Sequence, residues 1–165
     1  MRTKQLIPAL TAIGACLLAA ACGKDTTGDT AADTAMHTPA ATDSPHMQRT
    51  PSPEGAAVFF ITPADGDTVS NPVTVEFGIR GMSVVKAGVD EPATGHHHLI
   101  IDAGLPDLDM PIPANEHYVH FGDGSTSTQL TLEPGPHTLQ LLLGDHLHVP
   151  HDPPVASEQI TITVE

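Results

Sequence analysis

From residue 57 onward, no stretch of this chain carries the 3.6-residue apolar period of an amphipathic helix. The chain instead contains short apolar runs in which every second residue is apolar, separated by clusters of Pro, Gly, Asp and Asn. Alternation of this kind is typical of half-buried β-strands, and the clusters are typical of turns. The pattern predicts an all-β domain, because no helix is available to cover a parallel sheet.

Seven strands are expected, at residues 58–61, 72–79, 97–102, 117–121, 128–132, 137–143 and 159–164. In the second of them, Val73, Val75 and Phe77 share one face of the strand. Seven alternating strands resemble an immunoglobulin-like antiparallel β-sandwich that lacks its disulfide. A closed barrel is the alternative.

The N-terminal part of the chain has the pattern of an export signal. Residues 1–21 combine a basic start with an apolar run that is short for a membrane span, which predicts a lipoprotein signal peptide. Cys22 follows Leu-Leu-Ala-Ala-Ala, which resembles the lipobox of bacterial lipoproteins, and Cys16 is the competing choice for the lipid-modified residue. Gly23 resembles the default signal for the outer membrane. We expect a lipid-anchored protein of the bacterial cell envelope, on the periplasmic face of the outer membrane.

Residues 22–56 are rich in Thr, Ala, Asp and Pro and predict a disordered tether, since they cannot bury enough apolar surface to offset their ordering entropy. The folded domain is then expected at residues 57–165. A chain that begins at Cys22 keeps four basic residues against twenty acidic ones, a formal charge of −16. Such a charge repels nucleic acid and anionic lipid and attracts cations. With Cys22 as the single remaining cysteine, neither a disulfide nor a cysteine-based metal site is expected.

Histidine is concentrated in two stretches, residues 94–102 and 143–155, which hold six of the eleven histidines. Imidazole is a preferred ligand of copper and zinc. If successive strands reverse direction, the loops around these stretches lie at one end of the domain. Residues i and i+2 of an extended chain point to the same side, so His96-x-His98 and His146-x-His148 could converge on one ion. The predicted metal ligands are His96, His98, His120, His146, His148 and His151.

Asp145, Asp152 and Glu116 are candidates to hold the second ring nitrogen of a metal-bound histidine. The competing interpretation is structural, because histidines near a Pro-rich loop often donate hydrogen bonds to its carbonyls. In that interpretation His97 is a residue at the edge of the core that holds the loop in place. His137 fits it best, since it begins a strand at the opposite end of the domain.

Several longer motifs carry a family resemblance: TGHHHLIID, PIPANEHYVHFGDG, and PGPHTLQLLLGDHLHVPHDPPV followed by ITITV. On these motifs, roughly residues 57–165 resemble the bacterial domain of unknown function 4399 family. The resemblance implies an exported β domain. It supplies no reaction, ligand or catalytic residue, so the functional argument depends on the residues themselves.

Three functions are compatible with the sequence. The first is a lipid-anchored protein that binds copper or zinc at its histidine-rich end, for capture or buffering. The second is a non-enzymatic adhesion or scaffold module that binds an envelope protein or a glycan, with structural histidines. The third, a metal-dependent enzyme, is disfavoured, because the sequence contains no Ser-centred elbow, no HExxH motif and no paired catalytic carboxylates.

Overall fold

The computed structural model describes residues 47–165, so the expected signal peptide, Cys16, Cys22 and the first part of the expected tether lie outside the described residues. Within residues 47–165 no helix is long and apolar enough to span a membrane. The described chain forms nine strands: β1 (Ala57–Thr62), β2 (Thr68–Val69), β3 (Val73–Arg80), β4 (Ser83–Val84), β5 (Thr94–Ile101), β6 (Tyr118–His120), β7 (Ser127–Leu130), β8 (Gly135–Gly144) and β9 (Ile160–Val164). All seven expected strands are present, and β2 and β4 are additional.

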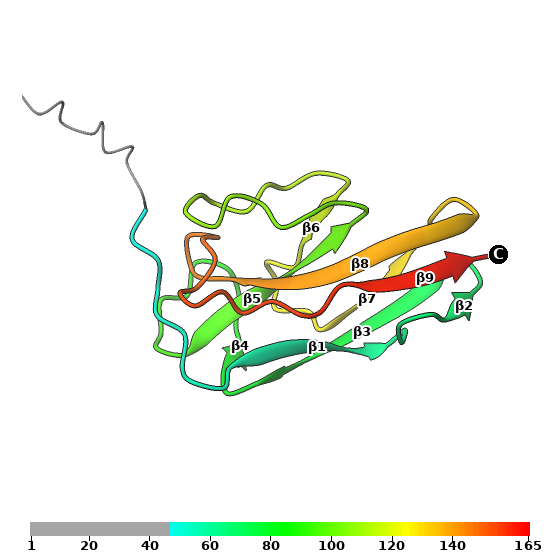
Figure 1. Ribbon diagram of the computed structural model, residues 1–165. Coiled ribbons are helices and arrows are strands. Elements are labelled where there is room, and N and C mark those ends of the chain that lie inside the picture. Colours follow the sequence, from blue (N-terminus) through cyan, green and yellow to red (C-terminus); the bar gives the residue numbers. More distant parts are fainter. Residues whose placement is uncertain (1–46) are drawn as a thin grey trace, which may run out of the picture. The chain divides into compact units, whose positions relative to one another are not determined.

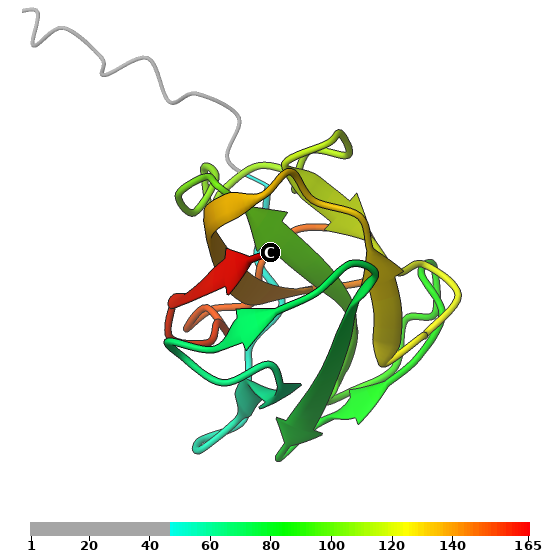
Figure 2. The same cartoon turned by 90° about the vertical axis from the view of Figure 1, so that its right-hand side faces the viewer.

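The strands form two sheets, one with the order β1-β3-β7 and one with the order β2-β9-β8-β5-β4, with β6 paired to β5. Figure 1 shows β8 and β9 above β1 and β3, and Figure 2 shows the same strands after a quarter turn. Neighbouring strands are mostly antiparallel, as in β5–β8 and β8–β9. The immunoglobulin-like sandwich is therefore confirmed, and the closed barrel is wrong.

The main core lies between the sheets and follows the predicted alternation. Val73, Val75 and Phe77 of β3 are buried there, as are Leu139, Leu141 and Leu143 of β8 and Ile160, Ile162 and Val164 of β9. Burial of one such side chain stabilises the fold by about 1.5–3 kcal/mol. A one-residue slip of a strand would turn its apolar set to the wrong face, so this core fixes the register.

A second, smaller core covers the outer face of the larger sheet. Ile100 of β5 and Leu142 of β8 pack there against Ile112, which comes from the long loop between β5 and β6. The Ile112 amide donates to the carbonyl of His148 at 2.9 Å, which joins this loop to the one that follows β8. Side chains on the outer face of β5 are therefore buried beneath two loops.

Residues 49–52, which composition assigned to the tether, belong to the folded unit. Pro51 and Asp152 form a parallel bridge, with the Ser52 amide donating to the Asp152 carbonyl and the Asp152 amide donating to the Thr50 carbonyl, both at 3.0 Å. The composition of this segment indicates only that it can bury little apolar surface. Hydrogen bonds to residue 152 hold it in place, and composition does not predict them.

Candidate metal centre

The site begins with two histidines on the outer face of β5. His96 and His98 are two residues apart in an extended strand, so they point the same way, and their ring centroids are 4.8 Å apart. Both are buried. Gly144 of β8 pairs with His96 in the register, and a Cβ at Gly144 would lie only 2.8 Å from Cε1 of His98. This glycine therefore leaves the space that the His98 ring occupies.

The third histidine comes from the neighbouring strand. His120 of β6 pairs directly with His98. Its ring lies 5.0 Å from that of His98 in a stacked arrangement and 4.9 Å from that of His96. One potential ligand nitrogen from each of the three rings lies within 4.8 Å of the others. Because His120 is exposed and the other two are buried, the group opens toward solvent on the β6 side.

A fourth histidine is supplied by the turn that follows β8. The ring of His148 lies 4.9 Å from that of His96, 4.8 Å from that of His120 and 6.1 Å from that of His98. The backbone of His148 has a φ of 68°, a left-handed conformation that is uncommon for residues other than glycine. We refer to His96, His98, His120 and His148 as the four-histidine cluster.

Asp145 builds the turn that carries His148. Its carboxylate Oδ1 accepts hydrogen bonds from the amides of Leu147 at 2.9 Å and Val149 at 3.0 Å. Its backbone carbonyl accepts from the His148 amide at 2.9 Å. The signal for this role is the Asp residue directly after a strand, since Asp side chains often bond the backbone two residues further on.

Desolvation favours the neutral form of His96, His98 and His120. Desolvation, followed by the charges of neighbouring imidazoles, lowers the pKa of His96 to about 4 and that of His98 to about 2. Desolvation also lowers the pKa of His120, and a positive charge on His148 would lower it further. Neutral imidazole is the form that binds a metal ion. At pH 7 the His96, His98 and His120 rings thus have lone pairs to offer.

The buried ring nitrogens of the cluster lack other partners. Both nitrogens of His96 and Nδ1 of His98 have no hydrogen-bond partner among residues 47–165. Leaving a buried polar atom unpaired costs about 1–3 kcal/mol. A neutral imidazole has one nitrogen with a free lone pair, and a bound cation would satisfy that nitrogen on each ring, so the donor set fits a metal ion.

Two of the six predicted ligands are not brought into the cluster. His146 points toward Asp90, with Nδ1 3.6 Å from Oδ1. His151 is buried, and its Nε2 lies 3.1 Å from the carbonyl oxygen of Thr94. The expected convergence of His146 and His148 is wrong because residues 145–148 form a turn, where residues two apart diverge.

The other expected partners also lie elsewhere. His97 is not at a loop but deep in the main core, with its ring 4.8 Å from that of Phe77. Among the described contacts, none of the three candidate carboxylates has a hydrogen bond to a cluster ring. Asp145 binds the turn backbone, Asp152 pairs with Arg49 at 3.6 Å, and Glu116 lies 3.9 Å from His117.

His137 is structural, as predicted. Its Nδ1 lies 2.6 Å from Oδ2 of Asp102, and its Nε2 lies 2.8 Å from the carbonyl oxygen of Glu133. The hydrogen bond to Asp102 is the main cause that raises the pKa of His137. This pair joins the start of β8 to the end of β5.

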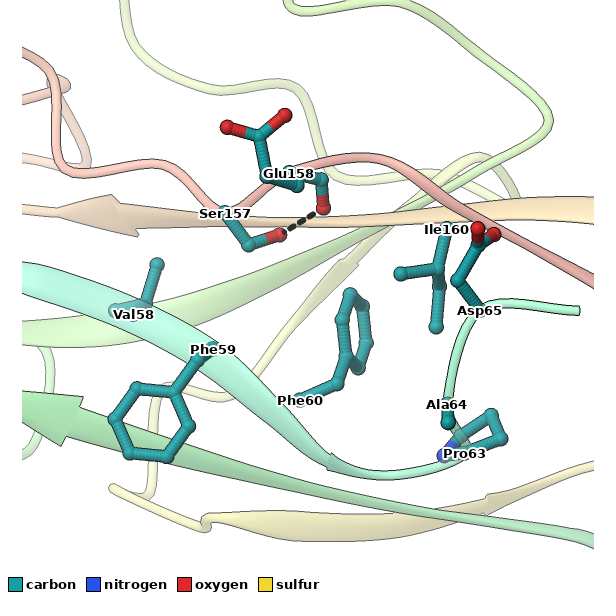
Figure 3. A pocket seen from close by; sticks show the side chains of 9 residues that line it. All are labelled: Val58, Phe59, Phe60, Pro63, Ala64, Asp65, Ser157, Glu158 and Ile160. Atoms are coloured by element: carbon teal, nitrogen blue, oxygen red, sulfur yellow. Dashed lines mark hydrogen bonds between the residues drawn. The ribbon is translucent and has the colours of Figure 1, made fainter.

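A pocket of about 260 Å³ lies on a different part of the sandwich. Figure 3 shows it between β1 and the segment that enters β9, with the ring of Phe60 directed toward Ile160 and that of Phe59 turned away. Its lining residues are Val58, Phe59, Phe60, Pro63, Ala64, Asp65, Ser157, Glu158 and Ile160. None of them is a histidine, so this pocket is separate from the four-histidine cluster.

Four imidazoles from two strands and a turn can hold zinc as a tetrahedron or copper in a flatter arrangement. If His96, His98 and His120 alone bind the ion, the fourth position is left for water. If His148 also binds, the coordination shell is closed. The arrangement therefore defines a β-sandwich protein with a candidate transition-metal centre.

Residues 75–165 match the family described as Domain of unknown function (DUF4399). The match covers more than half of the chain, so the chain belongs to this family, as its motifs indicated. The matched range contains all four histidines of the cluster. Neither the comparison with curated proteins nor the comparison with solved structures gave a match.

Proposed function

We propose that this protein binds one copper or zinc ion through the four-histidine cluster. The observation that carries the proposal is the convergence of His96, His98 and His120, whose ligand nitrogens lie within 4.8 Å of one another. The unpartnered buried nitrogens of His96 and His98 support it. The ring of His148, within 5 Å of two of these rings, supplies the fourth donor.

The ligand set favours particular metals. Four imidazole nitrogens suit Zn²⁺ and Cu²⁺, whereas Mg²⁺ and Ca²⁺ require oxygen ligands. By the usual order of affinities for divalent ions, Cu²⁺ binds more tightly than Zn²⁺ at such a site. Because imidazole binds a metal ion in its neutral form, the ion keeps its positive charge. The chain, with twenty acidic residues against six basic ones, provides a favourable field for that charge.

We infer that the site captures or buffers the ion. Four protein ligands complete a tetrahedral shell, which is typical of sites that hold a metal and leave no position for a substrate. His120, at the exposed rim, gives the ion a route of entry from solvent. The lipobox-like sequence at Cys22 would place this capture at the surface of a bacterial envelope membrane.

The test is calorimetric titration of the metal-free chain, purified without a histidine tag, with Cu²⁺ and Zn²⁺. We expect saturable binding of one ion, and at least a hundredfold loss in the double variant His96→Ala, His98→Ala. His146→Ala is the matched control, since His146 faces Asp90 and not the cluster. The proposal fails if wild type shows no saturable binding tighter than about 10 μM, roughly −7 kcal/mol, or if the double variant binds as wild type does.

A further inference from the structure

The turn that carries His148 is held from outside by the segment that precedes the sandwich. Thr50 Oγ1 donates a hydrogen bond to Oδ2 of Asp145 at 2.7 Å. The other carboxylate oxygen of Asp145 accepts the two turn amides. Asp145 is only 2% exposed. A carboxylate at such depth needs hydrogen bonds to offset its desolvation, and Thr50 supplies one of them.

Arg49 fixes the same segment to the chain that follows the turn. Its Nε donates to the carbonyl of Pro150 at 3.0 Å, and its guanidinium also bonds the carbonyl of His151. The side chain of Arg49 is only 15% exposed, and it pairs with Asp152 at 3.6 Å. We call residues 49–52 the N-terminal strap. Figure 1 shows it in cyan, beside the orange loop that leaves β8.

The turn needs this support because its conformation is unfavourable by itself. A non-glycine residue in the left-handed region, such as His148, costs about 1–2 kcal/mol. The turn gains some order from the Ile112 amide, which donates to the His148 carbonyl. The bonds of Asp145 to the Leu147 and Val149 amides define the rest. If the Asp145 side chain rotated away, these two amides would lose their acceptor, and His148 would occupy a wider range of positions.

We propose that Thr50 and Asp145 are positioning residues of the metal centre, and that the N-terminal strap presents His148 to the other three histidines. The proposal depends on the proposed metal-binding function. It makes residues 49–52, which lie within the expected tether, a part of the metal site. It also predicts that loss of the strap weakens metal binding while leaving His96, His98 and His120 in place, since those three are set by the ladder of β5, β6 and β8.

The experiment compares three variants of the full chain, with Cu²⁺ alone as the probe. Thr50→Val keeps the shape of the side chain and removes the hydroxyl donor, and Thr50→Ser keeps that donor. Ser52→Ala is the matched control: it removes another strap hydrogen bond, from Ser52 Oγ to the Pro153 carbonyl, that does not reach Asp145. We expect about tenfold weaker Cu²⁺ binding in Thr50→Val, as for one lost hydrogen bond to a charged group. Thr50→Ser should recover it to within about twofold, and Ser52→Ala should match wild type.

Two further measurements separate positioning from general stability. Electron paramagnetic resonance of the Cu²⁺ complex should show altered nitrogen coordination in Thr50→Val and a native spectrum in Thr50→Ser. Amide hydrogen exchange of the metal-free chains should be faster at Leu147 and Val149 in Thr50→Val, with β5 and β8 unchanged.

Native affinity and a native copper spectrum in Thr50→Val would overturn the inference, and so would equal losses in Thr50→Val and Ser52→Ala. If Thr50→Val fails to fold, Thr50→Ala, which also removes the hydroxyl, takes its place: a tenfold loss of Cu²⁺ affinity supports the inference, and native affinity overturns it. Absence of Cu²⁺ binding in wild type overturns the proposed function instead. Faster exchange at Leu147 and Val149 in Thr50→Val would then still support the ordering of the turn by the strap.

Discussion

Substitution of Gly144 by Ala tests whether the histidine rings are packed as tightly as the structure indicates. The new Cβ would lie 2.8 Å from Cε1 and 3.2 Å from Nδ1 of His98, and 3.3 Å from Cδ1 of Ile112. Contacts under 3.0 Å are not tolerated, and His98 is buried, so its ring can move only by displacing its neighbours. Overpacking of this kind costs about 1–3 kcal/mol.

We expect Gly144→Ala to lower the melting temperature of the metal-free chain by roughly 4–12 °C, and to weaken Zn²⁺ and Cu²⁺ binding at least tenfold because the His98 ring is displaced from the cluster. Thermal unfolding by circular dichroism and calorimetric titration measure the two effects. Gly104→Ala is the matched control, because a Cβ at Gly104 would meet nothing within 4 Å. Native stability and native affinity in Gly144→Ala would contradict this, because they would mean that the His98 ring has room to move.

Three further results are expected. Burial lowers the pKa of His97 from 6.5 to about 4. Between these two pH values the unfolded chain binds a proton at His97 and the folded chain does not. His97 should therefore make the metal-free chain about 3 kcal/mol less stable at pH 4 than above pH 6.5. In urea unfolding, the stability of His97→Leu should fall less over this pH range. An equal fall in both chains would contradict this. The hydrogen bond to Asp102 raises the pKa of His137, so this pair should stabilise the fold below pH 6.5. Its contribution, under about 1 kcal/mol, should be lost as pH rises through the raised pKa. In urea unfolding, His137→Gln should show no such loss. At a free Zn²⁺ concentration of a hundred times Kd, bound zinc should stabilise the fold by about 3 kcal/mol. A chelator should therefore lower the melting temperature of wild type and leave that of the double variant His96→Ala, His98→Ala unchanged.

The sequence predicted most of the fold because the core depends on alternation. Val73, Val75 and Phe77 fixed the face of β3, and the three alternate leucines of β8 did the same there. β2 and β4 were missed because two residues are too few to show a period. Their pairing, parallel to β9 and β5, depends on the tertiary arrangement and not on a local pattern.

The site was predictable where it depends on strand geometry and unpredictable where it depends on turns. The spacing of His96 and His98 needs only an extended chain, and His120 needs only a neighbouring strand. The choice between His146 and His148 needs the turn that Asp145 builds, which strand spacing does not describe. The contribution of Thr50 was hidden because it is separated from Asp145 by 95 positions in a segment of low-complexity composition.

We propose that four histidines, from β5, β6 and the turn after β8, share one ion. X-ray absorption spectroscopy of the full chain, loaded with one equivalent of Zn²⁺ and free of any histidine tag, tests it most directly. We expect four nitrogen ligands at about 2.0–2.1 Å from the zinc, with the outer-shell pattern of imidazole. In His148→Ala we expect an oxygen ligand to replace one of these nitrogens. A shell of oxygen ligands in the wild-type protein would contradict it.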